Sequence, residues 1–137
     1  QEELEKNQLY EGMQELTTQG HAVLCALAYH QSLEEVPIRS SDLYERYTKI
    51  CERLDADSVS ERRVRDHLSD MNMLGLISVY EHNEGLSAGR YHEYELDVPL
   101  TAVLDVLLST NRFKDLADII ESTADNNNLL QSDLSDY

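Results

Sequence analysis

The 137-residue sequence has no tryptophan, two cysteines, two prolines and only eleven lysine and arginine residues. Two cysteines are too few for the disulfide framework of a small secreted domain, and Cys25 and Cys51 both fall in apolar helical stripes, so we expect buried, reduced thiols. No apolar run approaches the length of a membrane span, and no signal segment opens the sequence. We therefore expect a soluble, cytoplasmic protein without a membrane partner.

Motifs of catalysis are also missing. The five glycines form neither a GxxxxGK phosphate loop nor a GxGxxG fingerprint, no CxxC or HExxH pair occurs, and no serine or cysteine stands in a nucleophile elbow. His82 and His92 are the one histidine pair that a hairpin would bring close, but a cross-strand pair has no metal-specific spacing. We expect neither catalytic residues nor a metal site, and hence no enzyme in this chain alone.

Basic residues are not only scarce but unevenly distributed. The 27 acidic residues give a formal net charge of −16, which argues against a protein that coats nucleic acid non-specifically. Such acidity is typical of proteins adapted to molar salt, where the Debye length is about 3 Å, although ordinary proteins can also be acidic. Residues 39–65 nevertheless carry +1, while the rest of the chain carries −17. These basic residues either face an anionic partner or pair with nearby carboxylates on solvated helix faces.

Hydrophobic periodicity predicts a mainly α-helical domain with a small β-hairpin. Residues 4–16 keep helical spacing without a capping residue ahead of them, as in a helix that began earlier. Further helices are predicted, with their candidate caps, over about residues 18–30 (Thr17 or Thr18), 40–54 (Ser40 or Ser41), 60–74 (Ser60, or Ser58 with Glu61 as a capping box), 100–109 and 111–124 (Asn111). An edge strand is predicted at 36–39, and two alternating strands flank a glycine-bearing loop at 83–89. This order predicts a winged helix-turn-helix, a three-helix core with a hairpin wing, extended by N- and C-terminal helices.

The helix predicted over about residues 60–74 is the best candidate for a recognition element. Its exposed face should carry arginines, which can engage guanine bidentately or clamp phosphate, opposite an apolar face. Ser60 and the first backbone amides are placed to hold a phosphate at the helix N-terminus. Asp66 and Asp70 neutralise part of the same face, so they either orient the arginines or mark an ordinary solvated helix.

In combination, four segments resemble the C-terminal domain of archaeal replication initiators, the relatives of the origin recognition complex and cell division control proteins. The segments are VSERRVRDHLSDMNMLGLI, GRYHEYEL, LTTQGHAVLCALA and DLYERYTKIC, and the resemblance covers about residues 3–108. The acidic composition is similar to that of a haloarchaeal member. The resemblance implies a nucleoid-associated domain that binds double-stranded DNA at origin repeats. Other initiator subunits or the replicative helicase are further implied partners.

The resemblance also implies a domain organisation and a set of DNA-binding residues. Residues 1–16 would end the lid of an ATPase module that uses ATP and Mg²⁺ in the full-length protein, with neither cofactor bound by this chain. Residues 17–110 would form the winged helix, 111–124 a C-terminal helix and 125–137 a flexible tail. The recognition helix, about 60–74, and the wing, about 82–92, would supply the DNA contacts: Ser60, Arg62, Arg63, Arg65, Ser69, Gly89 and Arg90.

The wing departs from the pattern of the family. Members often carry further basic residues after the glycine and arginine, whereas this wing continues with Tyr91 to Glu95 and has acidic residues at Glu81 and Glu84. The helix is therefore expected to recognise DNA more than the wing does. Two alternatives remain open: a winged helix that contacts protein, or a dimeric transcriptional regulator whose helices after Pro99 form the dimer interface.

Overall fold

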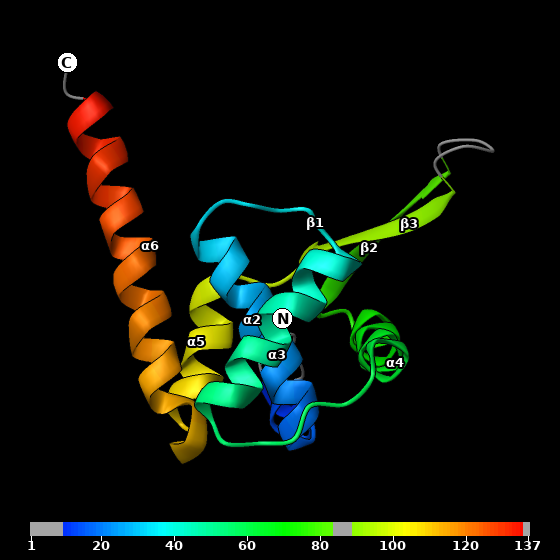
Figure 1. Ribbon diagram of the computed structural model, residues 1–137. Coiled ribbons are helices and arrows are strands. Elements are labelled where there is room, and N and C mark those ends of the chain that lie inside the picture. The colour runs from blue at the N-terminus through cyan, green and yellow to red at the C-terminus, as the bar shows by residue number, and fades with distance from the viewer. Residues whose placement is uncertain (1–9, 84–88, 136–137) are drawn as a thin grey trace.

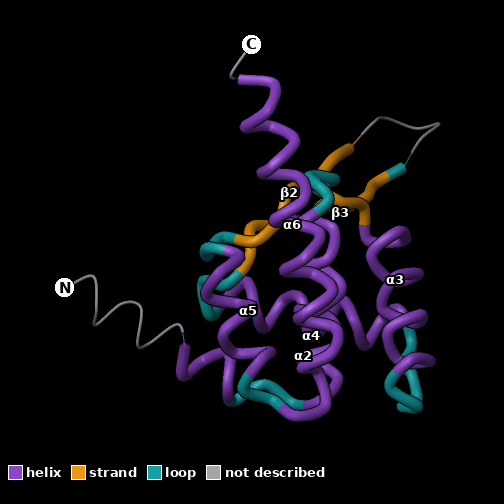
Figure 2. The backbone as a smooth tube through the Cα atoms, turned by 90° about the vertical axis from the view of Figure 1, so that its left-hand side faces the viewer, coloured by secondary structure: helices purple, strands orange, loops and turns teal. Residues whose placement is uncertain are grey.

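The computed structural model describes residues 10–83 and 89–135, and the surroundings of their side chains as far as residue 126. Residues 10–14 are helical. The elements that follow are α2 (Thr18–Ser32), β1 (Ile38–Arg39), α3 (Ser40–Arg53), α4 (Glu61–Met73), β2 (Ile77–Asn83), β3 (Arg90–Leu96), α5 (Leu100–Leu108), the 3-10 helix η1 (Asn111–Phe113) and α6 (Lys114–Ser135). The helices gather into one body, from which the β2–β3 hairpin and the last turns of α6 project (Figures 1 and 2). The predicted winged-helix architecture is confirmed.

Helix α2 is the centre of the core. Residues 21–28 are buried without interruption, and the helix contacts α3, α4, α5, α6 and β3. A helix that is buried all round must be covered on every side, which the flanking elements do here. Its start is fixed by Thr17, whose hydroxyl accepts a hydrogen bond from the Gly20 amide at 3.2 Å, as the sequence predicts.

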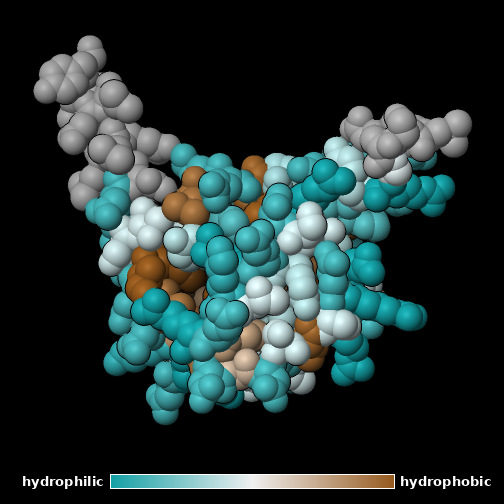
Figure 3. All heavy atoms as spheres, viewed as in Figure 1, coloured by the Kyte–Doolittle hydropathy of each residue, from teal (hydrophilic) through white to brown (hydrophobic). Residues whose placement is uncertain are grey.

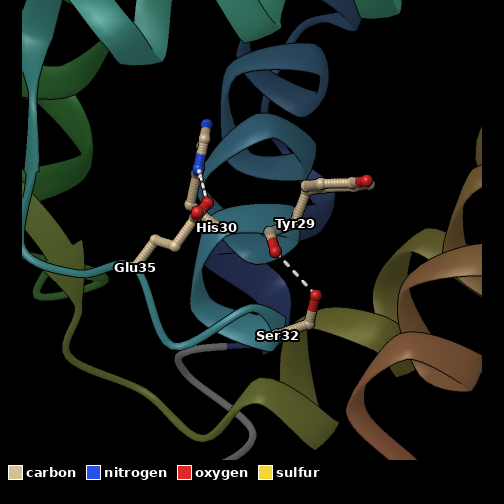
Figure 4. Close-up of polar contacts among 4 residues, drawn as sticks. All are labelled: Tyr29, His30, Ser32 and Glu35. Atoms are coloured by element: carbon tan, nitrogen blue, oxygen red, sulfur yellow. Dashed lines mark hydrogen bonds and ion pairs between the residues drawn. The ribbon is translucent and has the colours of Figure 1, made fainter. Parts of the chain in front are cut away.

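The turn after α2 is held by side chains on opposite sides of the helix end (Figure 4). The Ser32 hydroxyl donates to the carbonyl of Tyr29 at 2.6 Å, and His30 Nδ1 lies 3.1 Å from a carboxylate oxygen of Glu35. Glu34 has a positive φ of 59°, a conformation that non-glycine residues rarely adopt. Burial lowers the pKa of His30, and the hydrogen bond to Glu35 opposes that shift. These contacts turn the chain from α2 toward β1.

The cap of helix α3 lies before both of its predicted caps, Ser40 and Ser41. Arg39 is the N-cap, in extended conformation and without a side-chain hydrogen bond to the helix, while Ser40 and Ser41 are already helical. The cap prediction is wrong because Ile38 and Arg39 pair with β3, so the chain passes directly from a strand into the helix. Tertiary pairing, rather than a serine hydroxyl, sets this boundary.

The link between α3 and α4 is held by two tyrosines of α3. Tyr47 is fully buried, and its hydroxyl accepts a hydrogen bond from the Val59 amide at 2.9 Å and donates to the side-chain oxygen of Gln19. Tyr44 donates to the Val59 carbonyl at 2.9 Å. Burial raises the pKa of Tyr47 to about 12, so the phenol keeps its donor proton at all moderate pH values. Both tyrosines therefore fix the segment that leads into α4.

The three strands form an antiparallel sheet in the order β1-β3-β2. Ile77 pairs with Leu96 and Val79 with Tyr94, and this face packs on the core. The register pairs His82 with Tyr91 and Glu81 with His92, so the two histidines point to opposite faces of the ribbon and cannot share a metal.

The C-terminal segment differs from its prediction in two ways. The chain after α5 forms η1 with Thr110 as N-cap, so Asn111 is not a cap, and α6 begins at Lys114. The predicted helix over 111–124 is too short, because α6 continues to Ser135, while the flexibility predicted for 125–137 stays a prediction. Residues 114–135 contain no glycine or proline, so nothing in the backbone chemistry ends the helix at 124.

Candidate nucleic-acid interface

Helix α4 is built to present one face outward. The Ser60 hydroxyl accepts a hydrogen bond from the Arg63 amide at 3.2 Å, which confirms Ser60 as the cap. Val64, Leu68 and Met71 are almost fully buried and fix the opposite face against the core. After α4 the chain reverses at Gly75, whose φ of +80° is the left-handed conformation predicted there.

The outward face carries the side chains that the sequence singles out. Arg62, Arg63, Arg65 and Ser69 are all exposed, as are Asp66 and Asp70. Within residues 10–83 and 89–126, no carboxylate lies within 4.0 Å of any of the three arginine side chains as an ion pair. Pairing with neighbouring carboxylates therefore does not account for these arginines. Their charges are available to a partner.

The hairpin stands beside α4 and extends past it (Figure 1). Burial raises the pKa of Tyr94 on β3, and the positive charge of Arg65 on α4 opposes that shift. Arg90 is the first residue of β3 and is exposed, and Gly89 before it has a φ of +71°. The predicted wing also includes residues 84–88, which lie outside the described part of the chain.

The outer face of the sheet carries a row of side chains that sequence reasoning missed. The Arg39 guanidinium lies 4.1 Å from the centre of the Tyr91 ring, and the His82 ring stacks on Tyr91 at 4.8 Å between centroids. His82 Nε2 lies 2.6 Å from a carboxylate oxygen of Glu93, without the alignment of a hydrogen bond, so this is a charge contact when the imidazole is protonated. Alternation in RYHEYEL could have placed Tyr91 and Glu93 on one face, but not Arg39 beside them.

A second acidic residue on this face is also engaged within the sheet. Tyr80 donates a hydrogen bond to Glu95, and this bond raises the pKa of the phenol. Glu93 and Glu95 thus have partners in the hairpin, while Glu81 lies exposed on the opposite face. Two of the carboxylates of the wing are therefore engaged by side chains of the hairpin itself.

Comparison with known proteins identifies the domain. A family model described as the C-terminal winged helix domain of CDC6 matches residues 11–106. The chain belongs to this family. ORC1-type DNA replication protein 15 of Haloarcula marismortui is 39% identical over 127 residues, an alignment that covers 93% of this chain and 31% of the relative. ORC1-type DNA replication protein 10 of Halobacterium salinarum is 35% identical over 130 residues, with 93% and 31% covered.

A solved structure of the Aeropyrum pernix ORC1 protein in complex with DNA has the same fold as this CDC6-type domain. Its TM-score is 0.74 at 27% identity, and the match covers 83% of this chain and 29% of that one. The relatives from Haloarcula and Halobacterium agree with the acidic composition expected of a halophile. The matched region is the winged-helix domain and not a catalytic module. In the described residues, no helix has the length and apolar character to cross a bilayer.

Proposed function

We propose that this domain binds double-stranded DNA at replication origins, with α4 as the recognition helix and the β2–β3 hairpin as the wing. The observation that carries the proposal is the exposed arginine face of α4, free of intramolecular ion pairs within the described residues, in a chain of net charge −16. An Aeropyrum pernix ORC1 protein with the same fold was solved in complex with DNA, which supports this assignment.

The geometry suggests distinct roles along α4. The Ser60 oxygen already accepts a hydrogen bond from Arg63, so its hydroxyl proton is available to donate to a phosphate at the positive end of the helix. Arg62 and Ser69 lie on the face opposite the buried residues and would meet base edges in the major groove. Arg63 and Arg65 flank this face, where phosphate contacts would position the helix.

The wing contributes less charge. Gly89 turns the chain so that Arg90 begins β3 at the outer end of the hairpin, where its guanidinium would enter a minor groove or lie along the backbone. Glu81 and the other carboxylates of the hairpin oppose any further phosphate contact. Most of the sequence reading is therefore assigned to α4.

Further proposals concern the full-length protein. The chain spans about a third of the curated relatives that it matches. An ATPase module that binds ATP and Mg²⁺, a lid that ends within residues 1–16, and contacts with other initiator subunits or the replicative helicase are proposed for the full-length protein. They rest on the family resemblance.

Origin binding is tested by fluorescence anisotropy with duplexes from candidate origin repeats and from shuffled repeats, across a range of salt concentrations. Arg62→Ala is expected to weaken binding to the repeat by about 1–3 kcal/mol and to reduce the difference in affinity between the repeat and the shuffled duplex. Arg63→Ala should weaken binding to both duplexes alike, and it should reduce the slope of log affinity against log salt concentration by about one. Lys114→Ala, which removes a basic residue exposed at the start of α6, is the matched control and should change neither. Equal, weak binding by the wild type and by all variants contradicts the proposal.

A second candidate is a winged helix that contacts a protein. It is favoured by the acidic stem of the hairpin and by Tyr80, which is 41% exposed on the outer face of the sheet. In that case Tyr80→Ala, and not Arg62→Ala, would impair association with the rest of the initiator. The regulator alternative has less support, because α5 and α6 bury their apolar faces against α2 within the domain.

A further inference from the structure

A groove lies between α3 and α6, with α2 as its floor. Its volume is about 500 Å³, within the range of known ligand pockets. The wall from α6 is aliphatic: Ile119 is 36% exposed, whereas Leu116 and Ile120 are buried. Figure 3 shows apolar surface gathered in a hollow beside α6. The groove therefore offers apolar area that the domain itself does not cover.

The wall from α3 is basic. Arg46, Lys49 and Arg53 line it and follow one another at the spacing of a single helix face. Lys49 lies 3.8 Å from Glu45, a pair in which both side chains are largely exposed and which is therefore weak. For Arg46 and Arg53, no ion pair is found in the described part of the chain. Glu52 is the acidic residue of the lining, so the groove is net positive in a strongly acidic protein.

Arg46 is held in place before any partner arrives. Its guanidinium carbon lies 4.5 Å from the centre of the Tyr29 ring, a cation–π contact at the floor of the groove. Its Nε is buried and has no hydrogen-bond partner within the described residues. Arg46 as a whole is half-buried, and a guanidinium fixed on an aromatic ring has already lost conformational freedom before it meets a carboxylate.

We propose that the α3–α6 groove binds an acidic amphipathic helix of a partner protein. Leucine- or isoleucine-like side chains of that helix would pack on Ile119, and its carboxylates would meet Arg46, Lys49 and Arg53. This is the helix-in-groove mode, in which residues one turn apart anchor an amphipathic helix. In molar salt, charges are screened beyond about 3 Å, so long-range attraction contributes little to binding. Ion pairs in direct contact, combined with burial of apolar surface, can still hold a partner.

Duplex DNA fits this surface less well than a helix does. A phosphate backbone offers little apolar surface to cover Ile119, which is the exposed part of the aliphatic wall. The groove also lies on the other side of α2 and α3 from α4 (Figure 1). The partner helix and DNA would therefore bind at the same time, and the proposal stands independently of the role assigned to α4.

The test is a selection of displayed helical peptides on the folded 137-residue chain. Two libraries of about four helical turns share an apolar face, and the flanking positions hold Asp or Glu in one and Lys in the other. The acidic library is expected to yield binders, and the lysine library none of comparable affinity. If the acidic library gives no more binders than the lysine library, the proposal is overturned.

Variants then assign the binding to the groove. Arg53→Glu and Ile119→Asp change exposed side chains, and each should weaken the selected peptide at least about tenfold, or 1.4 kcal/mol. Lys114→Glu reverses a charge on α6 outside the groove and should change affinity by less than about twofold. Circular dichroism shows that each variant is folded, and Arg53→Glu carries the comparison if Ile119→Asp does not fold. Equal losses from Arg53→Glu and Lys114→Glu would mean that net charge alone drives binding, which contradicts the proposal.

Competition with DNA separates this proposal from the one for α4. Duplex DNA should not displace the peptide, and Arg62→Ala should leave peptide affinity unchanged even if it abolishes DNA binding. If DNA displaces the peptide and Arg53→Glu weakens DNA binding, the groove belongs to a nucleic-acid surface and the peptide proposal is wrong.

Discussion

The hydroxyl of Tyr47 is expected to be a main support of the α3–α4 turn, and Tyr47→Phe removes it while keeping the ring in the core. The loss leaves the Val59 amide without its acceptor, and the side-chain oxygen of Gln19 with only the weak thiol donor of Cys51 at 4.0 Å. Gln19 is only partly buried, so water can replace that second bond. The Val59 amide bonds to an oxygen on a fully buried side chain, although Val59 itself is half-buried, and a donor left unsatisfied away from water costs about 1–3 kcal/mol. We expect a loss of about 2 kcal/mol in the free energy of unfolding.

Tyr44→Phe is the matched control, because it removes a hydroxyl from the same helix that bonds the carbonyl of the same residue. Tyr44 is half-buried and donates to the Val59 carbonyl, which can accept from water instead. Its expected cost is that of one ordinary hydrogen bond, about 1 kcal/mol.

Urea unfolding of both variants and the wild type, followed by circular dichroism at one salt concentration, measures these differences. The slopes of the free energy against urea should be equal, so that midpoints report stability alone. If Tyr47→Phe costs no more than Tyr44→Phe, the Val59 amide has another acceptor and the reasoning fails.

Three further predictions concern backbone, pH and thiols. Gly75→Ala should lower the free energy of unfolding by about 1 kcal/mol, because the residue has a φ of +80°. Space is not the reason, since an added Cβ would meet nothing within 4 Å. Gly12→Ala is the control, with equal space and no positive φ, and should not lower the free energy of unfolding in the same urea titration. Burial lowers the pKa values of His21 and His30 below the ordinary 6.5, so the unfolded chain binds more protons than the folded one as the pH falls through 6.5 toward the folded pKa. The free energy of unfolding should therefore drop in that window. His30→Gln should flatten the dependence of the urea midpoint on pH between about 7.5 and 5, and an unchanged slope contradicts this. Burial raises the pKa of Cys25 to about 12, so a thiol reagent at neutral pH should modify Cys25 only at the rate of unfolding, and rapid labelling of native protein contradicts its burial.

The sequence predicts those parts of the fold that depend on local chemistry. Ser60 caps α4 and Gly75 reverses the chain after it because each role requires a residue type that is rare elsewhere in a helix. The start of α3 is different, because pairing between Arg39 and Glu93 places the boundary, and these residues are far apart in the sequence. The support of Val59 by Tyr47 likewise joins positions that periodicity cannot relate.

The candidate site divides in the same way. Helical spacing predicts that Arg62 and Arg65 face outward, and the structure places both at the surface. Whether carboxylates neutralise them depends on distances between side chains, which the sequence leaves open. The α3–α6 groove could not be predicted, because its basic and aliphatic walls come from helices separated by the whole hairpin. No contact tests which arginine reads a base, so those roles stay predictions.

The short length of β1 has a consequence for how this domain can change during evolution. β1 pairs with β3 only at Tyr94 and Glu93, so the sheet has three strands at its base and two beyond that point. A two-stranded ribbon contributes little stability of its own. Substitutions at the exposed positions Glu81, Asn83 and Arg90 should therefore be nearly neutral for folding, while those at the three-stranded base are not. The outer ribbon can therefore change in sequence without any rebuilding of the core that carries it.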